Sequence, residues 1–130
     1  MTFMRSMKLI LGMLLVTASI NTAVAQETTA QERAQKQTES MTTNLELTED
    51  QIPKVYEINL GVNLKNEAIR NNAEMSEESK KEAITGNNDG RKAMLKNVLT
   101  EEQYTKFEQR EQMQMRRQEI KRVPKTITTE

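Results

Sequence analysis

The sequence predicts an all-α protein of about four helices in a thin, bent, antiparallel hairpin-like arrangement that dimerisation completes. Three observations support this prediction. The stretch Leu-Thr-acid-acid-Gln occurs twice, at residues 47–51 and 99–103, and it has the form of a helix start. Apolar residues recur at helical spacing after each copy. The chain has no Cys or Trp and few aromatic residues, so one copy can build only a small apolar core. We therefore expect a second copy to complete the core.

The first 25 residues predict a secretory signal peptide. Arg5 and Lys8 precede an apolar run over residues 9–16, and Ala23-Val24-Ala25 is a small-x-small cleavage pattern. The apolar run is too short for a transmembrane anchor, which is the alternative. We therefore expect cleavage after Ala25, periplasmic localisation, no stable membrane insertion after cleavage, and a mature chain with a net charge of −2.

The region after the cleavage site is polar. Residues 26–40 are expected to be partly disordered, although good helix formers make a helix over about residues 30–43 an alternative. The helical domain is placed at residues 41–123, and a disordered tail is expected at residues 124–130.

The second predicted helix covers about residues 49–73. Its apolar stripe contains Asn59 and Asn66, and a buried Asn there would be a register device, a client contact or a tolerated residue. The third helix follows Ser76, a good N-cap, and its stripe includes Arg91 between apolar positions. Residues 86–90 have the composition of a loop, so this segment is either a helix with a weak waist or a loop.

The two repeated stretches explain how the second and fourth helices start. In each, the Thr side chain caps the backbone N–H three residues on, and the Gln there reaches back to the N–H of the Thr. The preceding Leu is placed to pack against the fourth helical residue as a hydrophobic staple. The second copy starts a helix over about residues 101–122, which ends before Pro124. The predicted helix-capping residues are Leu47, Thr48, Gln51, Leu99, Thr100 and Gln103.

The residue types argue against catalysis. The chain has no His and no Cys, which removes the usual zinc and copper ligands and the nucleophile–base pairs built on His. Its many carboxylates lie beside Lys, Arg or helix starts, and no Gly-rich phosphate loop is present. We expect no enzymatic activity, no metal, no cofactor and, from the charge balance, no nucleic-acid binding.

The distal part of the fourth helix is basic. Three interpretations are open: a solvated face, a recognition surface for acidic or unfolded polypeptides, or a helix that lies on a membrane surface. The apolar face of this helix is narrower than a membrane-surface helix needs. The candidate polypeptide-binding residues are Arg110, Met113, Arg116, Arg117, Ile120 and Lys121.

The two complete Leu-Thr-x-x-Gln stretches behind a signal peptide resemble the Spy/CpxP-like periplasmic proteins, which are defined by an LTxxQ motif. The resemblance covers about residues 41–110. It implies a thin, cradle-shaped antiparallel dimer of bent helices. It also implies ATP-independent chaperone activity, or modulation of an envelope stress sensor. The expected partners are therefore unfolded or partly folded polypeptides, with docking on one folded envelope sensor protein as the alternative.

Overall fold

The computed structural model describes residues 28–123, and these residues form four helices and no strand. The helices are α1 (Ala30–Leu45), α2 (Gln51–Arg70), α3 (Glu77–Val98) and α4 (Glu101–Arg122). The predicted all-α fold is confirmed, and the predicted bounds of the fourth helix are those of α4. The predicted signal peptide and the predicted tail lie outside the described residues. None of the four helices is long and apolar enough to cross a membrane.

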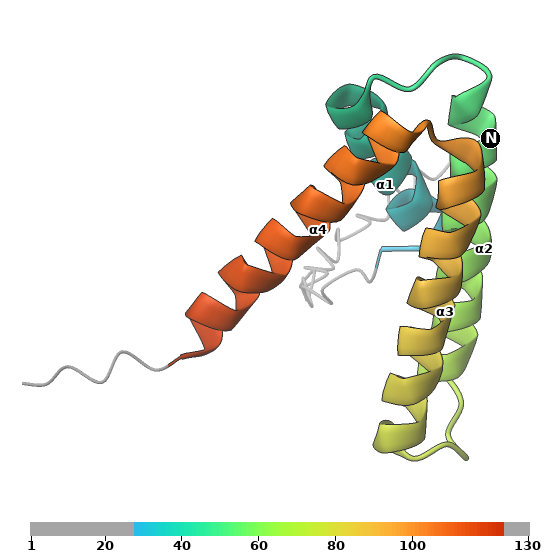
Figure 1. Ribbon diagram of the computed structural model, residues 1–130. Helices are drawn as coiled ribbons and strands as arrows, with labels where there is room; N and C mark the ends of the chain where they lie inside the picture. The colour runs from blue at the N-terminus through green and yellow to red at the C-terminus, as the bar shows by residue number, and fades with distance from the viewer. Residues whose placement is uncertain (1–27, 124–130) are drawn as a thin grey trace, which may run out of the picture.

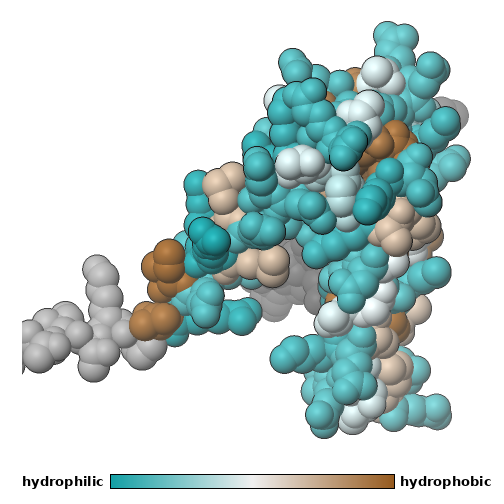
Figure 2. All heavy atoms as spheres, viewed as in Figure 1, coloured by the Kyte–Doolittle hydropathy of each residue, from teal (hydrophilic) through white to brown (hydrophobic). Residues whose placement is uncertain are grey.

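The helices form a two-armed shape (Figure 1). The first arm is an antiparallel hairpin of α2 and α3, with α1 packed along α2. The second arm is α4, which starts at the end of α3 and diverges from the hairpin, so its far end stands away from the other helices. Figure 2 shows a largely hydrophilic surface, with hydrophobic residues prominent near the far end of α4.

Helix α1 starts earlier than the predicted domain boundary at residues 40–41. Thr29 and Glu32 form a capping box, in which each side chain accepts a hydrogen bond from the other residue's backbone N–H, at 3.2 and 3.0 Å. Ala30 and Ala34 are buried. The prediction of a partly disordered segment is therefore wrong from residue 30 onward, and the helical alternative for this region is confirmed. Small buried side chains let α1 pack closely on α2, a contact that composition alone does not reveal.

Helix α3 runs without interruption through residues 86–90, so the loop alternative is wrong. Neither Gly86 nor Gly90 has a positive φ angle. Asn87 donates a hydrogen bond to the Asn66 side chain of α2 at 2.9 Å, and Asn88 accepts one from it at 3.3 Å. These bonds hold the polar segment against α2, which explains why tertiary contact overrides low helix propensity here.

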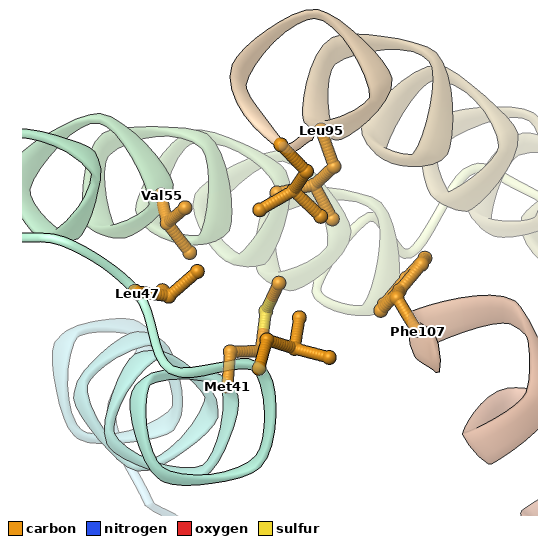
Figure 3. Packing of buried hydrophobic residues seen from close by; sticks show 7 residues of the cluster. Met41, Leu47, Val55, Leu95 and Phe107 are labelled. Atoms are coloured by element: carbon orange, nitrogen blue, oxygen red, sulfur yellow. The ribbon is translucent and has the colours of Figure 1, made fainter. Parts of the chain in front are cut away.

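The apolar core lies where the four helices come together (Figure 3). It contains Leu47 and Leu99, the first residues of the two repeated stretches, and Ile52 and Tyr104 pack against the same cluster. Both predicted staples therefore contribute to this core. Its buried residues are Met41, Leu45, Leu47, Val55, Leu95, Leu99 and Phe107.

Candidate functional site

The two repeated stretches pair with each other through their glutamines. The Gln51 amide donates from Nε2 to Gln103 Oε1 at 2.8 Å, and Gln103 Nε2 donates to Gln51 Oε1 at 3.0 Å. Each Oε1 also accepts the backbone N–H of its own capping threonine, at 3.0 Å for Thr48 and 2.9 Å for Thr100. Both predicted hydrogen-bond exchanges are therefore present, although α2 begins at Gln51, two residues later than predicted, with Asp50 in place of Thr48 as its N-cap.

Each glutamine also binds the end of a helix that belongs to the other half of the chain. Gln51 Nε2 donates to the Val98 carbonyl at the end of α3, at 3.1 Å. Gln103 Nε2 donates to the Leu45 carbonyl at the end of α1, at 3.2 Å. Both donors and the acceptor oxygen of each amide are used. We call this pair of glutamines the amide clasp. It joins the two helix starts, a contact that the sequence analysis did not identify, although the identical Gln in both stretches was a visible signal.

A second polar cluster connects α1, α2 and α3 around Asn59, which is fully buried. The Asn59 amide donates to Thr38 Oγ1 on α1 at 3.0 Å and accepts from Arg91 Nε on α3 at 2.8 Å. A buried amide with partners on two neighbouring helices is satisfied in one helix register only. Of the three alternatives for an Asn on this face, the contacts agree with the register device.

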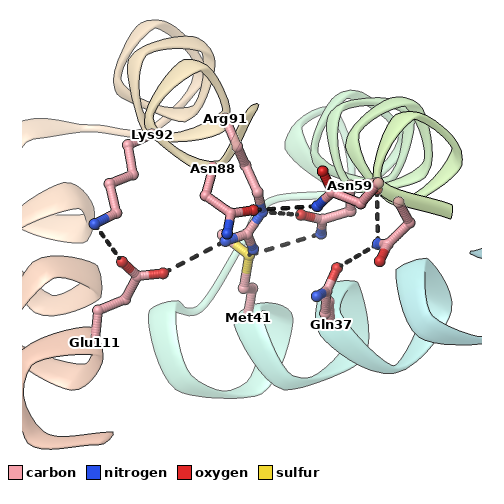
Figure 4. A network of polar contacts seen from close by, with 9 residues as sticks. Gln37, Met41, Asn59, Asn88, Arg91, Lys92 and Glu111 are labelled. Atoms are coloured by element: carbon pink, nitrogen blue, oxygen red, sulfur yellow. Dashed lines mark hydrogen bonds and ion pairs between the residues drawn. The ribbon is translucent and has the colours of Figure 1, made fainter. Parts of the chain in front are cut away.

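Arg91 extends this cluster to α4 (Figure 4). Its guanidinium lies 3.5 Å from Glu111 Oε1 and 5.6 Å from the centre of the Phe107 ring, in cation–π geometry. Lys92 pairs with the other oxygen of Glu111 at 2.9 Å. Burial lowers the pKa of Arg91, against the opposing effect of Glu111. The hydrogen bond to Glu111 raises the pKa of Lys92.

A cleft of about 350 Å³ lies between α1 and α4, with Arg91 among its lining residues. Met41, Leu45 and Phe107 supply apolar lining. The cations Lys36 and Arg110 also line it, and neither forms an ion pair with a residue of the described chain. The cleft therefore suits an apolar group that carries negative charge. In the sequence, Arg91 is visible only as one position of a helical stripe, with no local sign that it lines a cleft.

The structure separates the predicted polypeptide-binding residues. Arg110 lines the cleft. At 100° per residue, Met113, Arg116 and Ile120 lie on the side of α4 opposite to Phe107 and Glu111. Arg117 flanks that side, Lys121 lies about 40° around the helix from Phe107, and all five are exposed. We call Met113, Arg116, Arg117 and Ile120 the outer stripe of α4.

The described residues hold no group of three or more acidic side chains that could bind a metal ion. The cleft offers the guanidinium groups of Arg91 and Arg110, the Lys36 ammonium group and apolar contacts, and its one carboxylate, Glu111, is already paired with Arg91 and Lys92. The fold and these sites define a helical protein built from two capped helix starts that clasp each other.

The family follows from a comparison with family models. The chain belongs to the family described as a domain of unknown function, DUF4890, whose model matches residues 18–107. The match contains both repeated stretches and ends at Phe107, so the outer stripe lies beyond it. No curated protein and no solved structure matches the chain.

Proposed function

We propose that this chain is an exported, non-enzymatic polypeptide-binding protein with ATP-independent, chaperone-like or envelope-stress-related activity. One observation supports this proposal above the others. Beyond Phe107, α4 contains no buried residue, yet it carries Met113 at 50% exposure and Ile120 at 73%. Large apolar side chains left in water along one helix face are typical of interaction surfaces.

The composition of the outer stripe fits clients of varied sequence. Met113 has an unbranched, polarizable side chain that adapts to irregular apolar partners. Arg116 and Arg117 lie between the two apolar residues and would attract acidic segments and raise the rate of encounter. Because α4 diverges from the hairpin, an extended polypeptide has access to this face along the distal part of the helix (Figure 1).

The test is suppression of client aggregation, followed by light scattering. We expect the chain from residue 26 onward to suppress aggregation at stoichiometric amounts, and the double variant Met113→Ser with Ile120→Ser to lose most of that effect. The matched control is Leu64→Ser with Met94→Ser, because these side chains are also exposed, at 47% and 41%, but lie on α2 and α3. No suppression by the unsubstituted chain would refute the chaperone proposal, and equal loss in the control would refute the assignment to α4.

The cleft favours a second candidate, a regulatory or structural protein that docks on one folded envelope partner. Arg91 is held by contacts from three other helices, so the cleft is a preformed site and adapts less than the outer stripe does. Crosslinking and pull-down from an envelope extract distinguish the two candidates. One dominant folded partner, lost with Lys36→Glu and Arg110→Glu, supports docking, whereas many weak clients support the chaperone.

Periplasmic localisation is also part of this proposal. It depends on the signal-peptide pattern of residues 1–25. Mass spectrometry of the exported protein should find an N-terminus at Gln26, and a full-length chain retained in the cytoplasm would contradict export.

A further inference from the structure

A second groove lies between α1 and α2 and is more apolar than the cleft. Its volume is about 660 Å³. On α1, the middle of its lining faces away from the cleft, because Thr42 lies about 140° and 160° around the helix from Gln37 and Ser40 at 100° per residue. The groove is lined mainly by Thr38, Thr42, Thr43, Ile52, Pro53 and Tyr56.

The threonines of this groove are apolar in effect. Thr38, Thr42 and Thr43 each donate the hydroxyl to the carbonyl four residues earlier in α1, at 2.8, 2.8 and 3.1 Å. A hydroxyl bound to its own helix leaves the methyl group to face outward. Together with the side chains from α2, these methyl groups make an apolar slot.

The lining of the groove carries negative charge. Glu39 is the one charged residue among those that line it. Asp50 and Glu57 lie on the same face of α2 as Pro53, three residues before it and four after it, and both are exposed. The groove therefore fits a helix that carries apolar anchors beside positive charge.

The outer stripe of α4 has this chemistry and these dimensions. Met113 and Ile120 are seven residues apart, or about 10 Å along a helix, and the α1 wall of the groove spans residues 35–43, or about 12 Å. The α4 of the same chain lies on the cleft side of α1 and cannot reach the groove. The stripe can reach the groove of another copy.

We propose that the groove between α1 and α2 receives the outer stripe of α4 from a second copy of this chain. This inference depends on the proposed function, since it uses the same stripe. A stripe seated in a groove cannot contact a client, so self-association and client binding compete. A reciprocal exchange would give a closed two-fold dimer that stores the protein with its binding face covered.

The test is the dissociation constant of the self-associated chain, measured by sedimentation velocity on residues 26–130. Thr43→Arg puts a long cation on the groove wall, and Ile120→Glu disables the stripe. We expect each to raise the constant at least about tenfold, as loss of one central contact does. The matched control is Thr85→Arg on α3, because Thr85 is exposed and makes the same bond to a carbonyl four residues earlier. It should leave the constant unchanged.

Mixing the two disabled variants gives a sharper result. The groove of Ile120→Glu and the stripe of Thr43→Arg are both intact, so the mixture should form a heterodimer that neither variant forms alone. A chain that stays monomeric at all concentrations, or variants that associate like the unsubstituted protein, would overturn the inference. Thr43→Arg leaves the outer stripe intact and should still suppress client aggregation. If this variant suppresses aggregation normally but also self-associates like the unsubstituted chain, the groove inference is refuted and the proposed function is not.

Discussion

The amide clasp makes a quantitative prediction about stability. We consider Gln51→Ala, Gln103→Ala and the double variant. Each single change removes at least four side-chain hydrogen bonds, two of which are the same two bonds between the glutamines. The two substitutions should therefore not be additive.

The expected size follows from the number of bonds. One hydrogen bond contributes a net stability of about 0.5–1.5 kcal/mol. Since both glutamines are only partly buried, we expect each single variant to lose about 2–4 kcal/mol of unfolding free energy. The two shared bonds are lost in either single variant, so the double variant should lose about 1–3 kcal/mol less than the sum. A small domain has about 5–15 kcal/mol in total, so these effects are large.

The measurement is urea unfolding followed by far-UV circular dichroism. Gln109→Ala is the matched control, because Gln109 is exposed on α4 and has no side-chain hydrogen bond within the described residues. It should change the unfolding free energy by less than about 0.5 kcal/mol. Single losses that add within about 0.5 kcal/mol would refute the clasp and leave two independent helix caps.

Three further predictions use the same unfolding measurement. Gly86→Ala and Gly90→Ala should each stabilise the protein by about 0.5–1 kcal/mol, because both glycines are helical and an added methyl group would meet nothing within 4 Å. Destabilisation would mean that residues 86–90 of α3 require glycine. Glu46→Gly should stabilise by about 1 kcal/mol, since Glu46 ends α1 with a φ of 54°, and a loss would contradict this reason. The Glu111 hydrogen bond raises the pKa of Lys92, so this pair stabilises the folded protein fully below the unfolded pKa of about 10.4, and the stabilisation is lost as pH rises through the folded pKa. Glu111→Gln should remove this loss of stability at alkaline pH. An unchanged pH profile of the unfolding free energy would count against the pair.

Local signals in the sequence predicted most of the helical architecture. Thr100 and Gln103 determine the start of α4 through contacts within four residues, and the start observed is the start predicted. Helix α1 was predicted only as an alternative, because the buried side chains of its first half, Ala30, Ala34 and Thr38, are small and weakly apolar. The boundary error at residue 40 therefore has a physical origin in small, weakly apolar side chains.

The sites depended on contacts that no local pattern encodes. Asn59 and Arg91 are 32 residues apart and meet only when α2 and α3 form their hairpin. Either residue alone fits an exposed polar position, so the pattern could show that each lies in a stripe but could not show that they bind each other. The split of the predicted binding residues between the cleft and the outer stripe likewise required the direction of α4.

The distribution of apolar and polar contacts explains why one arm of this molecule is suited to binding. The apolar core lies at the junction, and away from it the seams of the hairpin arm are held by amides such as Asn63, which donates to Gln37 at 2.8 Å. These bonds specify register, but they bury little apolar surface. Beyond Phe107, Glu111 is the one residue of α4 in the described chain that forms ion pairs with another helix. Its exposed Met113 and Ile120 add little to the packing of the described helices, and their place on one face agrees with the proposed binding surface.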